Sequence, residues 1–297
     1  MLGLGATAVD DVLYVGSFPA ADEKLRVERS VRRCGGLTGA ALVAAARLGA
    51  KPAYAGCLGV DELSQYVAKN FEREGVSLTH ASRLPQARVV HSVIVVGQDT
   101  GSRNIFFEDS GAVGAHDSLP PEDIISGSKV LFIDHCGMRG NLRAARAARA
   151  AGVAIVADFE DAADPLFHEV AALVDHLVLS ERFAIALTRT DTAAEAALAL
   201  WRPGREAVVV TCGAQGSWSV TVARQTAPFH HPAFAVQAVD TTGCGDVFHG
   251  AYAARLAKGD NLEQRIRFAS AAAALNAAEA TAPTLAAVER FLEQHLS

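Results

Sequence analysis

The chain has 297 residues, a mass of 31.1 kDa and a formal net charge of −6. Half of the residues are hydrophobic and a fifth are charged, which is typical of a folded chain with a well-filled core and excludes extended disorder. The acidic balance argues against a nucleic-acid-binding protein, whose surface would be basic. A length near 300 residues is compatible with one large α/β domain or with two smaller ones.

The cysteines and the first residues indicate where the protein works. The five cysteines are scattered and form no Cys-x-x-Cys pair: Cys34, Cys57, Cys136, Cys212 and Cys244. We therefore expect free thiols in a reducing cytoplasm, without a disulfide framework or a zinc site. Met1–Ala6 lacks the basic start of a signal peptide, and no apolar stretch is long enough to predict a membrane span.

The N-terminal third combines a short buried strand with more exposed segments. Residues 2–6 are apolar and predict a strand, with Asp10 and Asp11 following its carboxyl end. Residues 13–33 carry many charges, and the alternation around Leu25 and Val27 predicts an exposed antiparallel strand. Gly35-Gly36 then precedes an alanine-rich helix over residues 40–48.

Two further segments predict a hairpin. Residues 88–97 and 102–108 flank Gln98-Asp99-Thr100-Gly101, whose composition is typical of a turn between antiparallel strands.

From residue 130 onward, apolar strands alternate with helices. The expected strands are 130–133, 153–157, 177–179 and 207–211, and the expected helices are 141–151 and 193–200. This alternation predicts an α/β fold with a doubly wound, mostly parallel sheet. We expect one domain over residues 1–297 with a small β-sheet lid assembled from about 11–34 and 87–110.

The C-terminal part is predicted to be almost entirely helical. Asp260 and Glu263 predict a capping box for a helix that runs to Ala280. Thr284 is expected to cap a last amphipathic helix.

The most informative run of the chain is Val239-Asp-Thr-Thr-Gly-Cys-Gly-Asp-Val-Phe-His-Gly250, a strand-like segment followed by a glycine turn and a helix. The first N–H groups of such a helix have no intrahelical partner and favour an anion. Asp246 lies in the expected first turn, where the helix dipole favours its ionised form and where it could accept a hydroxyl proton. This arrangement suits phosphoryl transfer, although an ordinary capped helix would also explain a lone Gly-x-Gly-Asp.

The same run closely resembles the C-terminal signature of the ribokinase-like (PfkB) sugar kinases, Asp-Thr-Thr-Gly-Ala-Gly-Asp-x-Phe-x-Gly, with Cys244 in place of alanine. Gly35-Gly36 with the following helix resembles the family's N-terminal signature, and residues 211–216 resemble its nucleotide loop. Residues 101–103 are similar to ketohexokinase-like members and residues 232–270 to sulfofructose kinases. The resemblance implies a doubly wound sheet with a β-lid, through which such kinases often form homodimers.

The resemblance also implies roles for individual residues. Asp246 would be the catalytic base, beside an anion hole formed by the amides of Gly243, Cys244 and Gly245. The sugar-like substrate would be bound by Asp10, Lys24, Gly36 and Arg103. ATP would be bound with Mg²⁺ by Ser180, Glu181, Thr211, Gly213, Gly216 and Asn276. Asp240 and Thr242 could hold a monovalent cation such as K⁺, a question that the sequence leaves open.

Several positions depart from the family pattern. No asparagine follows Gly36, and the family's Asn-x-x-Glu motif is Ser180-Glu181-Arg182-Phe183 here. His135-Cys136-Gly137 stands where sulfofructose kinases carry a sulfonate-binding arginine, and Arg139 follows slightly late. The loop over 276–283 is short and lacks the expected glycines.

These departures keep two alternatives open, a nucleoside kinase of the same fold and a non-catalytic, ligand-binding pseudokinase. Gly3-x-Gly5-x-x-Ala8 weakly suggests a dinucleotide site, but acidic residues follow where a helix should begin. Two further features have open interpretations. Arg32-Arg33 could be a solvated pair or a phosphate clamp, and His249 could contact phosphate or pack in the protein.

Overall fold

The computed structural model describes the whole chain except Gly101, Leu296 and Ser297, so the glycine of the predicted hairpin turn lies outside the described residues. The body is an eight-stranded sheet with the order β14-β13-β12-β11-β10-β9-β1-β4. Its strands are β1 Leu2–Leu4, β4 Ala53–Tyr54, β9 Val130–Asp134, β10 Ala154–Asp158, β11 His176–Ser180, β12 Ala207–Thr211, β13 Ser217–Thr221 and β14 Arg224–His231. The six strands from β12 to β4 are parallel, whereas β13 and β14 continue the sheet antiparallel.

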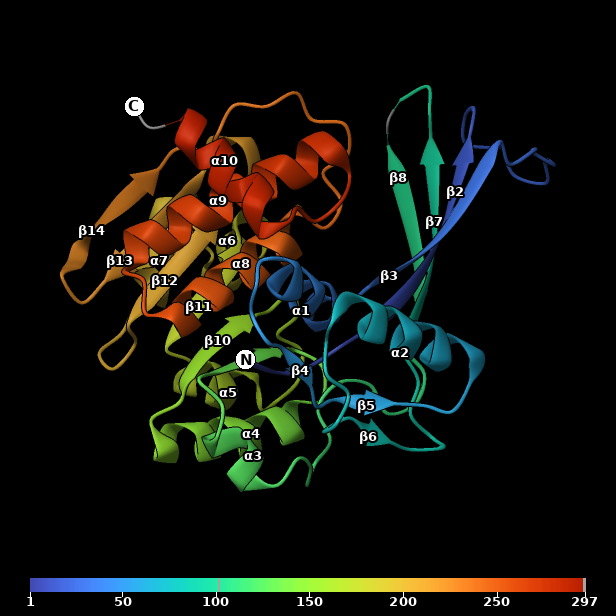
Figure 1. The fold of residues 1–297 in the computed structure, drawn as a ribbon. Helices are drawn as coiled ribbons and strands as arrows, with labels where there is room; N and C mark the ends of the chain where they lie inside the picture. The colour runs from blue at the N-terminus through green and yellow to red at the C-terminus, as the bar shows by residue number, and fades with distance from the viewer. Residues whose placement is uncertain (101, 296–297) are drawn as a thin grey trace.

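Helices cover both faces of this sheet (Figure 1). One face packs against α3 Glu122–Ser126, α4 Met138–Ala151, α5 Phe167–Leu173, α6 Glu181–Thr188 and α7 Ala193–Leu200. The other face packs against α1 Leu37–Arg47, α8 Cys244–Lys258, α9 Leu262–Glu279 and α10 Leu285–Gln294.

The strand sequences explain this double coverage. In β9, Leu131 and Ile133 belong to the core under the α4 side, while Val130 and Phe132 belong to the core under the α8 side. Successive side chains of a strand point to opposite faces, so a strand buried on both faces needs an unbroken apolar run. The doubly wound, mostly parallel sheet predicted from the sequence is confirmed.

A second, four-stranded sheet projects from the body and is called the lid below (Figure 1). Its order is β3-β2-β7-β8, with β2 Ala8–Val15, β3 Arg29–Gly35, β7 Val90–Gly97 and β8 Arg103–Glu108. The hairpin of β7 and β8 agrees with the prediction. The strand expected around Leu25 and Val27 does not form; β3 begins at Arg29, and both side chains are exposed, so little burial stabilises a strand there.

Smaller elements join the lid to the body. They are β5 Cys57–Leu58, α2 Glu62–Glu74 and β6 Ser82–Arg83, and a single 3₁₀ turn, η1 Gly213–Gln215, follows β12. None of the helices in the described part of the chain is both long and apolar enough to cross a membrane.

The cap of α9 differs from the prediction by one residue. Asn261 and Gln264 form the capping box, because Asn261 accepts from the Gln264 amide and Gln264 bonds back to the Asn261 amide. Asp260 instead forms an ion pair with Arg255 of α8. The predicted cap of α10 is confirmed, since the Thr284 side chain accepts from the Ala287 amide.

Candidate active site

The N-terminus of α8 provides free backbone donors. Gly243 precedes the helix with φ of 74°, a left-handed conformation that suits glycine. Within the described residues, the amides of Gly243, Gly245 and Asp246 have no hydrogen-bond acceptor. The Cys244 amide donates to Thr241 O at 3.3 Å, so it is already engaged, unlike its neighbours in the expected anion hole.

Asp246 is in the first turn of α8, as expected, but its charge state differs from the expectation. The residue is half-buried. Burial, and then the charge of the nearby Asp158, raises the pKa of Asp246 well above its usual value. Desolvation therefore outweighs the helix dipole here, and a raised pKa brings a carboxylate closer to the range of an efficient general base.

A buried histidine contacts the backbone of this first turn. The His249 side chain is 3% exposed, with Nδ1 2.7 Å from Gly245 O and Nε2 2.9 Å from Val178 O of β11. Both ring nitrogens face carbonyl oxygens, and a neutral imidazole donates to one of them at a time. The buried carboxyl of Asp158 lies beside the ring, with Oδ2 3.3 Å from Nδ1, and burial raises the pKa of Asp158 well above its usual value. These contacts agree with the packing alternative for His249.

The neighbouring strand ends in another buried carboxylate. Asp134, the last residue of β9, accepts from the amides of Ala6 and Cys136 at 2.7 and 2.8 Å and from the Thr38 hydroxyl at 2.7 Å. The Asp134 oxygens therefore connect the end of β1 and the start of α1 to the sheet edge at which the site lies.

Asp10 approaches the site from β2, the second strand of the lid sheet. It is paired in register with Arg33 of β3 and Ser92 of β7, so the three side chains share one face of the lid. Burial raises the pKa of Asp10, and the charge of Asp10 is the last of the causes that raise the pKa of Asp246. The contact of both carboxylates with one substrate hydroxyl stays a prediction.

Gly36 has a structural role of its own. Its φ is 82°, and a Cβ there would lie 2.7 Å from backbone atoms of Thr7 and Ala8. Close packing of the start of α1 on the β1–β2 segment therefore requires glycine at this position even without a substrate.

The structure separates the adjacent arginines Arg32 and Arg33. Neighbouring residues of a strand point to opposite faces, and Arg32 forms a two-bond ion pair with Asp11 at 2.7 and 2.8 Å. Arg33 lies on the Asp10 face, with Nη1 3.6 Å from Asp240 Oδ2. The sequence analysis did not assign Arg33 to the site, although alternation along the strand opposite Asp10 carries that information.

A second lid arginine reaches the same loop. Arg103 of β8 donates from Nη1 to the Thr242 hydroxyl at 2.8 Å. Arg103 and Arg33 thus connect the lid with the segment that leads into α8. Lys24, in contrast, is an exposed residue of the β2–β3 connection, which lies at the free end of the lid in Figure 1, and the structure does not bring it to Asp10.

The oxygens expected to hold a monovalent cation are largely engaged. Asp240 Oδ1 accepts from the Thr242 amide at 2.8 Å, and Oδ2 faces Arg33. The Thr242 carbonyl accepts from Asn276 Nδ2 at 3.0 Å. K⁺ binding at Asp240 and Thr242 stays a prediction, and Asn276, which is 4% exposed, acts here as a support of the loop.

The residues expected at the nucleotide lie at the carboxyl ends of β11 and β12, on the same sheet edge as Asp134 and Asp158. Ser180 is in register with Thr211, and its hydroxyl caps α6 by accepting from the Phe183 amide, with Glu181 in the first turn. The glycine-flanked turn η1 follows. Gly213 opens it, and a Cβ on Gly216 would lie 2.0 Å from His231 O. Their contacts with a nucleotide stay predictions.

Comparison with known proteins places this geometry in a family. The model of the pfkB family carbohydrate kinases matches residues 3–285. The chain is 31% identical to the ribokinase of Haemophilus influenzae over 303 residues, covering 98% of this chain and 97% of that protein. It is 25% identical to the deoxyribokinase of Salmonella typhimurium over 98% of this chain and 96% of that protein. The chain belongs to the PfkB carbohydrate kinases.

Solved structures agree with this assignment. Ribokinase from Thermotoga maritima superposes with a TM-score of 0.86 at 27% identity, over 98% of both chains. The fold of Arabidopsis thaliana ribokinase, solved with ribose and ATP, matches with a TM-score of 0.86 at 22% identity, over 98% of both chains. The protein is thus a sugar kinase, an ATP-dependent phosphotransferase with an alcohol group as acceptor. The predicted family and fold are confirmed.

Proposed function

We propose that the enzyme phosphorylates a hydroxyl of a small sugar derivative, with a ketose or an anionic ketose such as sulfofructose favoured, and that Asp246 is its base. The observation that carries the proposal is the half-buried Asp246, with a raised pKa, in a helix turn with unpaired amides. A reacting hydroxyl held between Asp10 and Asp246 would have an acceptor for its proton.

The residues would act in a simple order. Asp10 hydrogen-bonds the sugar and orients the attacking hydroxyl toward the N-terminus of α8. Asp246 takes the proton as the oxygen attacks the terminal phosphorus of ATP. The free amides of Gly243 and Gly245 donate to the transferred phosphoryl oxygens, where negative charge accumulates.

We propose that Mg²⁺ arrives with the ATP phosphates, whose charge it would neutralise. In the described part of the chain, no group of three His, Cys, Asp or Glu side chains stands ready to hold a metal ion. Glu181, in the first turn of α6, is the acidic side chain among the residues expected at the nucleotide.

The lid arginines support an anionic acceptor. Arg33 and Arg103 both point to the segment before α8, and each could donate hydrogen bonds to a sulfonate or carboxylate of the substrate. Ribose is the second candidate, since ribokinases are among the relatives at 31% and 28% identity.

A homodimer through the lid is part of the proposal, as is a single domain over residues 1–297 with its lid at about 11–34 and 87–110. Val31, Ile105 and Phe107 are exposed and share one face of the lid by register. Such a face exposes apolar area that a second copy would cover. Sedimentation of Phe107→Glu beside the wild type tests this, and a wild-type monomer contradicts it.

The acceptor is tested by ADP release from ATP and Mg²⁺ over a panel of ketoses, sulfofructose, ribose, phosphorylated hexoses, aldonates and nucleosides. A preference for an anionic ketose that weakens in Arg33→Gln supports the proposal. Turnover with ribose or a nucleoside alone would replace the substrate class. Ligand binding without phosphate transfer to any acceptor would favour the pseudokinase alternative.

A further inference from the structure

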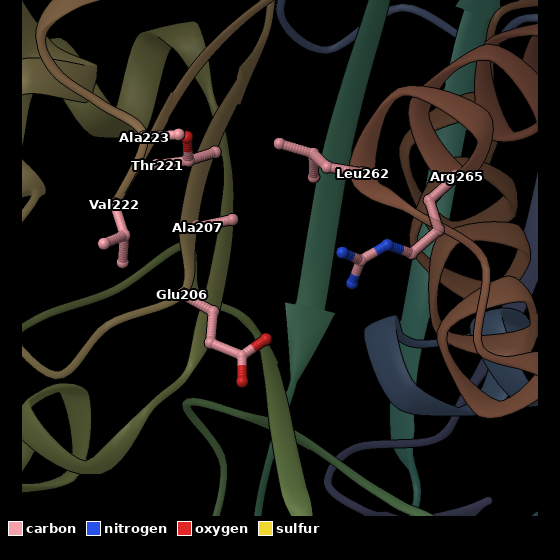
Figure 2. A pocket seen from close by; sticks show the side chains of 7 residues that line it. All are labelled: Glu206, Ala207, Thr221, Val222, Ala223, Leu262 and Arg265. Atoms are coloured by element: carbon pink, nitrogen blue, oxygen red, sulfur yellow. The ribbon is translucent and has the colours of Figure 1, made fainter.

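A pocket of about 370 Å³ lies at the edge of the sheet opposite the active site. Its lining consists of Glu206, Ala207, Thr221, Val222, Ala223, Leu262 and Arg265 (Figure 2). Ala207 is the first residue of β12, whereas Thr211, expected at the nucleotide, is the last. Four residues of strand place the two sites roughly 13 Å apart along β12, and the sugar kinase mechanism uses none of the lining residues.

The positively charged group of this pocket is the guanidinium of Arg265, which extends from α9 toward the strands on the other side (Figure 2). Arg265 is 8% exposed. Its Nε and Nη1 are buried without a hydrogen-bond partner, and no carboxylate of the described chain lies within 4.0 Å. The guanidinium lies 5.2 Å from the centre of the Tyr252 ring, which fixes its position but does not neutralise it.

The carboxylate across the pocket has a different partner. Glu206 Oε2 is 3.2 Å from the buried His176 Nε2, and the Glu206 side chain is 67% exposed. The contact with His176 is the largest cause that lowers the pKa of Glu206, and the charge of Arg265 lowers it further. Glu206 therefore interacts electrostatically with Arg265 across the pocket but does not form an ion pair with it.

A buried charge without a partner is unfavourable, and an anion that binds beside it removes the penalty. The remaining lining offers the Thr221 hydroxyl as a second donor and the apolar side chains of Val222, Ala223 and Leu262. We propose that this pocket binds a small carboxylate- or phosphate-bearing molecule, with its anionic group on Arg265. The proposal is independent of which sugar the enzyme phosphorylates.

Calorimetric titration of the full chain with inorganic phosphate and with acetate, both in a saturating non-hydrolysable ATP analogue and Mg²⁺, tests the proposal. The terminal phosphate of the analogue occupies the anion hole of α8, so the remaining binding reports on the second pocket. Saturable binding of either anion is expected, weakened at least tenfold in Arg265→Gln because a charge-assisted hydrogen bond is lost. Arg265→Lys keeps the charge and should retain part of the affinity.

Two further variants test the proposal even if the Arg265 substitutions misfold. Ala223→Glu adds a negative charge at an exposed position of the mouth and should weaken binding, while Glu206→Gln removes one and should strengthen it. The absence of saturable binding, or binding equal in the wild type, Arg265→Gln and Ala223→Glu, overturns the proposal. Binding that disappears when the ATP analogue is added belongs to the active site and overturns it as well.

Discussion

Replacement of His249 by glutamine tests how the first turn of α8 is held in place. The imidazole lies between Gly245 O and Val178 O, at 2.7 and 2.9 Å, and 3.3 Å from a carboxyl oxygen of the buried Asp158. The amide nitrogen of glutamine can take the place of only one of the two ring nitrogens. Asp158 or one of the two carbonyls then loses the group that faces it.

The expected cost follows from these contacts. Leaving a buried carbonyl without its hydrogen-bond donor costs roughly 1–3 kcal/mol. Since the unfolding entropy grows with chain length, this corresponds to a fall in melting temperature of roughly 2–5 °C for a chain of this size. Urea unfolding at neutral pH, without nucleotide, measures the change in the free energy of unfolding.

Asp158→Asn and the double variant are the matched controls. If the two side chains act as a pair, the double variant should lose less stability than the sum of the two single variants. Turnover of the folded fraction of His249→Gln should also fall, because the helix turn that carries Gly245 and Asp246 loses a hydrogen-bond partner. A loss of stability under about 1 kcal/mol with additive effects would refute the pairing.

Three other substitutions have clear expectations. Gly36→Ala meets strand backbone at 2.7 Å with φ of 82°, so we expect roughly 1–3 kcal/mol of destabilisation, measured by urea unfolding; wild-type stability would contradict the strain. The Cys244 sulfur accepts a weak hydrogen bond from Asn276 at 3.3 Å, and burial raises the pKa of the thiol. We therefore expect Cys244→Ala to change turnover little and native Cys244 to react slowly with thiol reagents near pH 7. Rapid labelling would show that the thiol is activated. Because the folded-state pKa of Asp246 is raised, the native state holds this proton more tightly than the unfolded state, and stability falls as pH rises from about 4 through the folded pKa. Asp246→Asn lacks this loss and should melt at a higher temperature than the wild type at pH 8 in calorimetry, and an equal or lower melting temperature would contradict the shift.

Much of the fold follows from local patterns. The apolar runs of β9 and β12 predict buried strands because both faces of these strands are covered, and burial then requires apolar residues at successive positions. The capping box was misplaced by one residue because Asp260 and Asn261 are both good caps. Only the position of Arg255, which attracts Asp260, decides between them.

The site was predictable where one short segment carries it. Glycine spacing and the helix start indicate the Asp246 turn, and a strand-by-strand reading could have added Arg33 from its pairing with Asp10. The raised pKa of Asp246 was not predictable, since it depends on burial and on Asp158 from another strand. The support that Asn276 gives to the loop likewise joins segments 34 residues apart.

The measurement that tests the central claim most directly is ADP release by Asp246→Asn beside the wild type, with ATP, Mg²⁺ and the best acceptor of the panel. Loss of the base should lower turnover by roughly 10²–10⁴-fold, while ATP binding, measured by calorimetry, stays within a few-fold of the wild type. Asparagine keeps the size of the side chain, so a structural cause would appear as a fall in melting temperature. Undiminished phosphate transfer by the variant would contradict the assignment of Asp246 as the catalytic base.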